Sequence, residues 1–137
     1  NNEKIVFTGY TSSPSDYILN SDVGVLPTYF EGESSPYSVI EYLSCGKPVI
    51  ATDKGEIRDM LTTLGELAGI LIQLKDDNKP SVIDLMEAME KMVLDKTFYD
   101  QKVKLTPKAF EKFTIEKCKQ EYMELYHKAL TDEFNVV

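Results

Sequence analysis

One part of the sequence alternates between strand and helix signals so closely that it limits the fold to a few classes. Residues 23–27 and 48–52 are short apolar runs typical of buried strands, and residues 36–45 between them carry the signals of one helix. Ser35 is a favourable N-cap, and Pro36 suits the first helical position. Two strands joined through one helix pair in parallel by a right-handed crossover. This unit therefore predicts an α/β protein.

The rest of the chain continues this alternation. Apolar runs predict further buried strands at residues 4–8 and 69–74, and Ser13 with Pro14 predicts the start of a short helix. Later helices each carry an apolar face that is predicted to be buried. The residues of these faces are Ile57, Met60, Leu61 and Leu64; Val82, Leu85, Met86, Met89 and Val93; and Ile115, Cys118, Tyr122, Leu125, Tyr126 and Ala129. The pattern predicts a Rossmann-like parallel sheet with helices on both faces and a helical C-terminal tail.

Local signals also predict where the later helices begin and end. Ser81 followed by Asp84 predicts a capped helix start. Pro107 predicts an interruption of the next helical segment, because proline lacks a backbone N–H. The last helix is predicted over residues 114–130.

Composition restricts the classes of function. A length of 137 residues and a hydrophobic share of 42% fit one folded domain. The net charge of −8 argues against nonspecific nucleic-acid binding. No apolar run approaches the ~20 residues of a membrane span. Cys45 and Cys118 follow no metal-binding spacing, so we interpret them as reduced thiols of a cytoplasmic protein.

The start of the helix at residues 36–45 is a predicted anion site. The first turn of a helix has free backbone N–H groups and a partial positive charge, which together suit a phosphate. Glu33 lies in the loop before the helix, and Glu41 lies roughly 9 Å along its axis. The two carboxylates are too far apart to share one hydroxyl, so each could accept hydrogen bonds on its own side of a diphosphate. A nucleotide-diphosphate sugar has that layout of ribose hydroxyls, diphosphate and sugar hydroxyls.

The same residues resemble a known family. Glu33 and Glu41 match the E-x7-E motif of retaining glycosyltransferases with two Rossmann-like domains, which is the GT-B fold of family 4, glycosyl transferases group 1. The resemblance continues through residues 41–52, which read EYLSCGKPVIAT, and through residues 55–57 at the next helix start. Two stretches near the C-terminus also resemble the family's last segment. The resemblance therefore covers nearly the whole chain.

The resemblance implies a role for each candidate residue. Glu33 would be the catalytic residue that contacts the donor sugar near the reacting carbon, Glu41 would bind the nucleotide ribose, and Tyr10 would approach the base. The implied donor-binding residues are Ser34, Ser35, Tyr37, Ser38, Glu41 and Tyr10. Pro36 stands where the family often has glycine, and it removes one backbone donor. Each candidate also has a plainer interpretation, as a solvated acid near a helix start, a helix cap or a surface aromatic residue.

The resemblance further implies the substrate and the missing partners. A nucleotide-diphosphate sugar would be the donor substrate, with no metal or other cofactor required, and Asp76 and Asp77 are interpreted as turn residues. No segment here matches the family's basic residues for the diphosphate or its N-terminal acceptor-binding domain. Residues 1–137 are therefore predicted to be a C-terminal nucleotide-sugar-binding domain without its first strands, inactive alone. Peripheral membrane association of the full enzyme is left open.

Two other functions remain open. The same helix start would serve a noncatalytic α/β module that binds a phosphate or a protein partner. Another nucleotide-sugar enzyme of the same fold, such as an epimerase, is the second alternative, and the E-x7-E pair argues against it. An acceptor-binding domain upstream in the parent gene would favour the transferase over the module.

Overall fold

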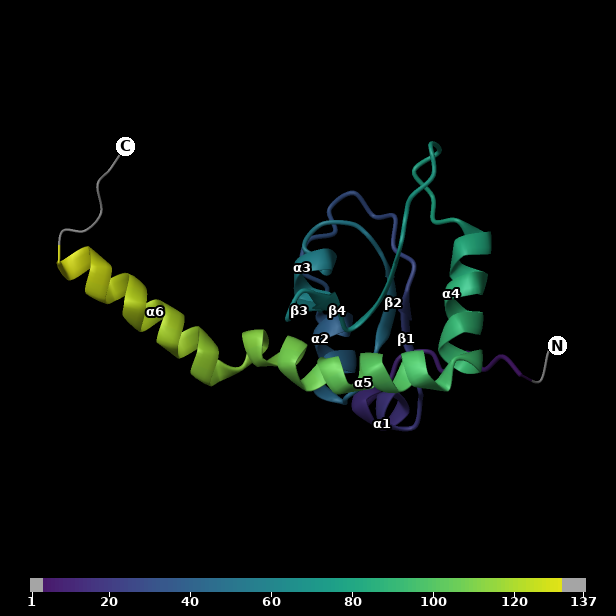
Figure 1. Ribbon diagram of the computed structural model, residues 1–137, viewed down its shortest axis with the longest axis horizontal. Helices are drawn as coiled ribbons and strands as arrows, with labels where there is room; N and C mark the ends of the chain where they lie inside the picture. The colour runs from purple at the N-terminus through teal and green to yellow at the C-terminus, as the bar shows by residue number, and fades with distance from the viewer. Residues whose placement is uncertain (1–3, 132–137) are drawn as a thin grey trace.

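A three-stranded parallel sheet with the strand order β1-β2-β5 forms the centre of the molecule (Figure 1). The structure is a computed structural model that describes residues 4–131. The sheet strands are β1 (Gly24–Leu26), β2 (Val49–Thr52) and β5 (Gly69–Ile72), and a small antiparallel hairpin comprises β3 (Thr62–Thr63) and β4 (Glu66–Leu67). The helices are α1 (Pro14–Leu19), α2 (Tyr37–Ser44), α3 (Ile57–Leu61), α4 (Val82–Leu94), α5 (Lys96–Phe110) and α6 (Ile115–Leu130), with the 3-10 turn η1 (Glu111–Phe113) before α6.

Helices cover both faces of this sheet, as the alternation of strands and helices predicts. α2 and α3 lie on one side and α4 lies on the other (Figure 1). The core under α2, α3 and the end of α5 contains Val39, Leu43, Val49, Ala51, Ile57, Met60, Leu61, Ala68 and Ala109. The core under α4 contains Ile50, Ile72, Ala88 and Met92. Every residue of the central strand β2 is buried, as expected for a parallel strand covered on both faces. The predicted Rossmann-like α/β fold is confirmed.

The predicted strand at residues 4–8 is wrong. These residues form no strand, and the Phe7 side chain is 94% exposed. A short apolar run is stable as a strand only when a neighbouring strand pairs with it and a core covers one face. This run has neither within residues 4–131, and β1 is an edge strand of the sheet.

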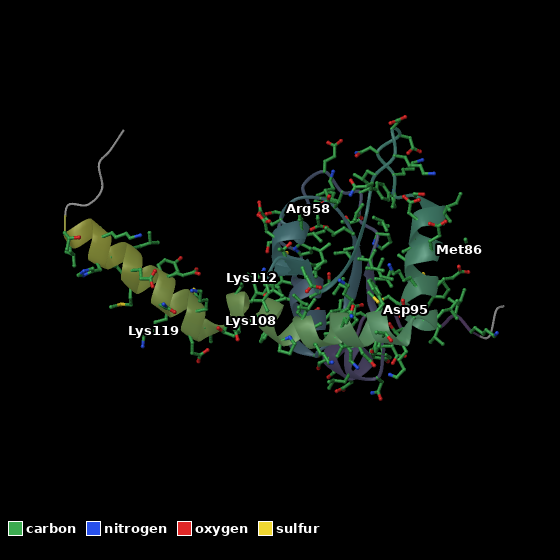
Figure 2. All side chains as sticks on the ribbon, viewed as in Figure 1. Arg58, Met86, Asp95, Lys108, Lys112 and Lys119 are labelled. Carbon is green, nitrogen blue, oxygen red and sulfur yellow. The ribbon has the colours of Figure 1, made fainter. Side chains whose placement is uncertain are left out.

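Helix α4 begins as predicted but buries a different face. The Ser81 hydroxyl accepts a hydrogen bond from the Asp84 backbone N–H at 3.2 Å, which confirms the capping signal. Leu85, Ala88 and Met92 pack against the sheet. The residues of the predicted face that are exposed instead are Val82, Met86, Met89 and Val93, of which Met86 is labelled in Figure 2. The helix carries two apolar stripes, and the one that contains Ala88 packs against the sheet.

Two other helix predictions differ from the structure. Leu64, predicted on the buried face of α3, lies beyond its end in the turn between β3 and β4, with a φ of 53°. Helix α5 continues through Pro107 rather than breaking there. The buried Thr106 hydroxyl donates a hydrogen bond of 2.8 Å to the carbonyl of Val103, the group that Pro107 cannot pair. A threonine before the proline thus replaces the lost backbone bond.

The last helix, α6, extends away from the sheet (Figure 1). Its start agrees with the prediction, because the Thr114 hydroxyl accepts a hydrogen bond from the Lys117 backbone N–H at 3.3 Å. None of its residues is buried, so the predicted burial of its apolar stripe is wrong. An amphipathic face is buried only where another surface meets it, and the described part of the chain places none there.

Candidate functional site

The loop between β1 and α2 lies at the carboxyl ends of the parallel strands, where open α/β sheets bind their ligands. The Thr52 hydroxyl at the end of β2 donates a hydrogen bond of 2.6 Å to the Thr28 carbonyl. Further along the loop, the Glu33 backbone N–H donates to the Phe30 carbonyl at 3.1 Å. The sheet therefore fixes the start of the loop, and a turn within the loop presents Glu33.

A second loop supports the backbone of Glu33 and Ser34. Gly55 has a φ of +54°, and a Cβ atom there would lie 2.3 Å from the Glu33 carbonyl oxygen. Only glycine permits both this conformation and this approach. The Glu56 backbone N–H donates a hydrogen bond of 2.9 Å to the Ser34 carbonyl. The loop that follows β2 thus holds the loop that follows β1.

Helix α2 begins one residue later than predicted. Pro36 is the N-cap, with an extended conformation, and no side chain caps the helix. Ser35, the predicted cap, donates its hydroxyl hydrogen bond to the Met60 sulfur at 3.6 Å. The prediction of Ser35 as the cap is therefore wrong, because its side chain turns toward the core. Its backbone still lies directly before the helix.

The first turn of α2 has unpaired backbone donors. The Val39 N–H donates to the Pro36 carbonyl at 3.1 Å. Among the described residues, no hydrogen bond is recorded for the N–H groups of Tyr37 and Ser38, the first two residues of the helix. Two such donors at a helix start form an anion-binding arrangement.

The carboxylates of Glu33 and Glu41 are likewise available. Neither forms a hydrogen bond or an ion pair with any residue in the range 4–131. Glu33 is half-buried in the loop, and Glu41 is exposed on α2. Each therefore offers acceptor oxygens to a ligand, one before the unpaired N–H groups and one after them along the chain.

A cavity of about 220 Å³ lies beside Glu41. Its polar lining residues are Thr8, Thr11, Tyr17, Ser38, Glu41 and Tyr42. The structure thus brings Ser38 and Glu41 together with the segment around Tyr10. Tyr10 itself is 96% exposed and does not line the cavity, whereas Thr8 and Thr11 on either side of it do.

The sequence reasoning missed one cluster at the same sheet edge. The Asp53 carboxylate accepts a hydrogen bond from Arg58 Nε at 3.1 Å, a second from Arg58 Nη2, and one from Gln73 Nε2 at 3.1 Å. The hydrogen bonds from Arg58 hold the pKa of the Asp53 carboxyl below its usual value, with a smaller contribution from Gln73 and against the opposing effect of partial burial. Asp53 and Gln73 each directly follow a parallel strand, and that placement was the signal that could have identified them.

Among the residues that it describes, the structure has neither a metal-binding group of side chains nor a membrane-spanning helix. No three His, Cys, Asp or Glu side chains of residues 4–131 are grouped to hold a metal ion. Asp77 accepts a hydrogen bond from the Lys79 backbone N–H at 3.2 Å, as a turn residue does. No helix in this range has the length and apolar character needed to cross a membrane.

Comparison with known proteins gives a family and a fold. Residues 1–95 match the model of the family described as glycosyl transferases group 1, and this range contains every candidate residue named above. Among solved structures, the chain is similar to sucrose-phosphate synthase from Thermosynechococcus elongatus, with a TM-score of 0.62 and 24% identity. That match covers 85% of this chain and 27% of the synthase, so the chain spans about a quarter of its length. No curated protein matches the chain significantly.

Proposed function

The chain belongs to the glycosyl transferases of group 1, and from that premise we propose that it is the donor-binding part of a retaining transferase. The donor is a nucleotide-diphosphate sugar, and the full enzyme transfers the sugar to a hydroxyl group of an acceptor. The acceptor is bound by residues outside this chain, in keeping with the partial coverage of the matching structure.

One observation carries the proposal: along the chain, two unpaired carboxylates, one in the loop before α2 and one on α2, stand on either side of two unpaired backbone donors at the helix start. Tyr37 and Ser38 offer N–H groups, with Glu33 before them and Glu41 after them. A phosphate alone needs only the N–H groups, and carboxylates next to it would repel it. Carboxylates are useful there when hydroxyl groups stand on both sides of the phosphates, as in a nucleotide-diphosphate sugar.

Each group then has a distinct task. Glu33 holds the sugar hydroxyls and is the catalytic residue, since it lies nearest to the carbon whose bond to the diphosphate breaks. Glu41 accepts hydrogen bonds from the ribose, and the cavity beside it takes part of the nucleoside, with Tyr10 next to the base. The diphosphate lies against the backbone of Ser34, Ser35, Tyr37 and Ser38.

Stabilisation of the leaving diphosphate determines how far this chain can act alone. The helix start supplies backbone donors where negative charge develops, which is the usual electrostatic contribution to such a reaction. Pro36 contributes no N–H, and the chain as a whole carries a net charge of −8. We therefore expect weak donor binding and no turnover from the 137 residues alone, and basic residues from the rest of the enzyme complete the site.

Chemical-shift mapping by NMR tests this function. Uridine, adenosine and guanosine diphosphates and their glucose conjugates are titrated into the chain, and the shifted amides are identified. We expect shifts at residues 33–41, and a loss of affinity of about 10-fold or more in Glu41→Ala, because hydrogen bonds to a charged group contribute about 1.5–3 kcal/mol. Glu90→Ala on the exposed side of α4 is the matched control and should bind as the wild type does.

The outcomes separate the transferase from the noncatalytic module. Binding of the nucleotide sugars that depends on Glu41 supports the donor site. Binding of inorganic phosphate at Tyr37 and Ser38 that is unaffected by Glu33→Gln and Glu41→Ala would favour a phosphate-binding module instead. Turnover by this chain alone would overturn the expectation that it lacks part of the catalytic site.

A further inference from the structure

The Asp53 carboxylate connects the loop after β2 with helix α3 five residues later and with the end of β5 twenty residues later. Asp53 directly follows strand β2, Arg58 lies on helix α3, and Gln73 directly follows strand β5. Arg58 approaches with Nε on one carboxylate oxygen and Nη2 on the other, which is the planar, two-point arrangement that lysine cannot reproduce. The Asp53 backbone N–H also donates to the Ile72 carbonyl at 2.9 Å. The cluster therefore has a defined geometry at both the side chain and the main chain.

The segment closed by the Asp53 and Arg58 pair is the one that supports Glu33. Between these two residues lie Gly55, where an added Cβ would lie 2.3 Å from the Glu33 carbonyl oxygen, and Glu56, whose N–H donates a hydrogen bond to the Ser34 carbonyl at 2.9 Å. The ion pair therefore connects the two ends of the turn that contacts the Glu33 loop. No comparable ion pair among the described residues connects to that loop directly.

We propose that Asp53, Arg58 and Gln73 are positioning residues for Glu33, acting through Gly55 and Glu56. The inference rests on the proposed function for the meaning of the Glu33 position, and it assigns no ligand contact to the three residues. A partly exposed ion pair contributes little to overall stability, so its value here is geometric. Misplacing a reacting group by 1 Å can cost about 100-fold in rate, so an ion pair that positions the Glu33 loop affects the reaction even if it adds little stability.

Asp53→Asn tests the proposal in the ligand-free chain, with Asp100→Asn as the matched control. Asp100 also pairs with a cation, Lys96 at 3.1 Å, but on the surface of α5 far along the chain from the loop. We expect Asp53→Asn to shift the amide resonances of Glu33 and Ser34 and to speed hydrogen exchange of the Glu56 N–H about tenfold, since local openings have small free energies. The control should leave all three unchanged.

Arg58→Lys keeps the charge and removes the planar two-point contact. It should shift the same amides in the same direction by a smaller amount, and it serves as the deciding variant if Asp53→Asn does not fold. Unchanged Glu33 and Ser34 amides in a folded Asp53→Asn or Arg58→Lys chain would overturn the proposal.

A ligand measurement separates positioning from a general structural role. With the nucleotide sugar that the wild type binds best in the panel above, Asp53→Asn should lose affinity about tenfold. Its affinity for the corresponding nucleoside diphosphate should fall by a smaller factor, because that ligand lies against the Ser34 backbone but does not reach Glu33. Equal losses for both ligands would contradict a role specific to Glu33. If the wild type binds no nucleotide sugar, the proposed function fails, but the ligand-free shifts still decide the positioning role.

Discussion

Helices α2 and α6 each carry an apolar face, and only α2 buries it. Val39 and Leu43 of α2 are almost completely enclosed between the sheet, α3 and α5, whereas α6 has no buried residue and extends away from the sheet (Figure 1). Amphipathic periodicity states only that one side of a helix is apolar. The packing partner decides whether that side becomes a core. The candidate site includes the start of the enclosed helix, so the backbone N–H groups of Tyr37 and Ser38 are held in place before any ligand arrives.

The largest expected effect compares a leucine in each helix. Leu43→Ala in α2 should lower the free energy of unfolding by about 2–5 kcal/mol, because it leaves a cavity in the core. Leu125→Ala in α6, where the side chain is half exposed, should change it by no more than about 0.5 kcal/mol. Urea denaturation of both variants measures the difference. Equal losses would show that α6 packs against the body in solution.

The next effect concerns the support of the Glu33 loop. Gly55→Ala should destabilise the chain by about 2 kcal/mol or more, since it combines a left-handed conformation with a clash against the Glu33 carbonyl. Gly65→Ala shares the positive φ but meets no atom within 4 Å, so it should cost only about 1 kcal/mol. Thermal unfolding gives the stabilities, and the Glu33 amide resonance reports the loop. A Gly55→Ala chain with an unmoved Glu33 amide would show that the two loops are independent.

A smaller effect is expected at the helix on which α2 packs. Thr106→Val in α5 removes the hydroxyl that donates to the Val103 carbonyl, which Pro107 cannot pair, and it should cost about 1–3 kcal/mol because a partly buried acceptor loses its partner. Thr131→Val just after α6 removes a hydroxyl that bonds exposed carbonyls and should have little effect. Denaturation curves of the two variants test this. A neutral Thr106→Val would mean that another group pairs the carbonyl.

The smallest effect is a pH dependence at the sheet edge. Arg58 and Gln73 face the Asp53 carboxylate, and their hydrogen bonds lower its pKa in the folded state. This contribution to stability is fully present above the unfolded-state pKa of about 3.9, and it is lost as the pH falls through the lower folded-state value. The stability difference between the wild type and Asp53→Asn should therefore shrink between pH 6 and pH 3. A constant difference over that range would argue against the ion pair.

The sequence predicted the part of the fold that local signals determine. For residues 23–52, the predicted order of β1, α2 and β2 is correct, because the apolar runs and Pro36 mark their limits closely. The same local signals placed Glu33 and Glu41 at a helix start, and their roles toward a donor remain proposals.

The incorrect predictions have a common physical cause. Tertiary contacts decide between conformations that the local sequence permits. Helix α4 has two apolar stripes, and only packing against Ile50 and Ile72 selects the one with Ala88. Ser35 could cap α2 but bonds the Met60 sulfur instead. Asp53 and Gln73 are 20 residues apart, so no local pattern reveals that they pair, although each directly follows a parallel strand and is therefore placed at the same sheet edge.

The most direct test of the central claim compares two substitutions against two ligands. Affinities for a nucleotide-diphosphate sugar and for its nucleoside diphosphate are measured by NMR titration in Glu33→Gln and in Glu41→Gln. If the two carboxylates lie on opposite sides of the diphosphate, Glu33→Gln weakens binding of the sugar conjugate alone, and Glu41→Gln weakens both ligands by the same factor of about 10 or more. Two substitutions with the same effect on both ligands, or with none, would contradict the proposed placement of the donor.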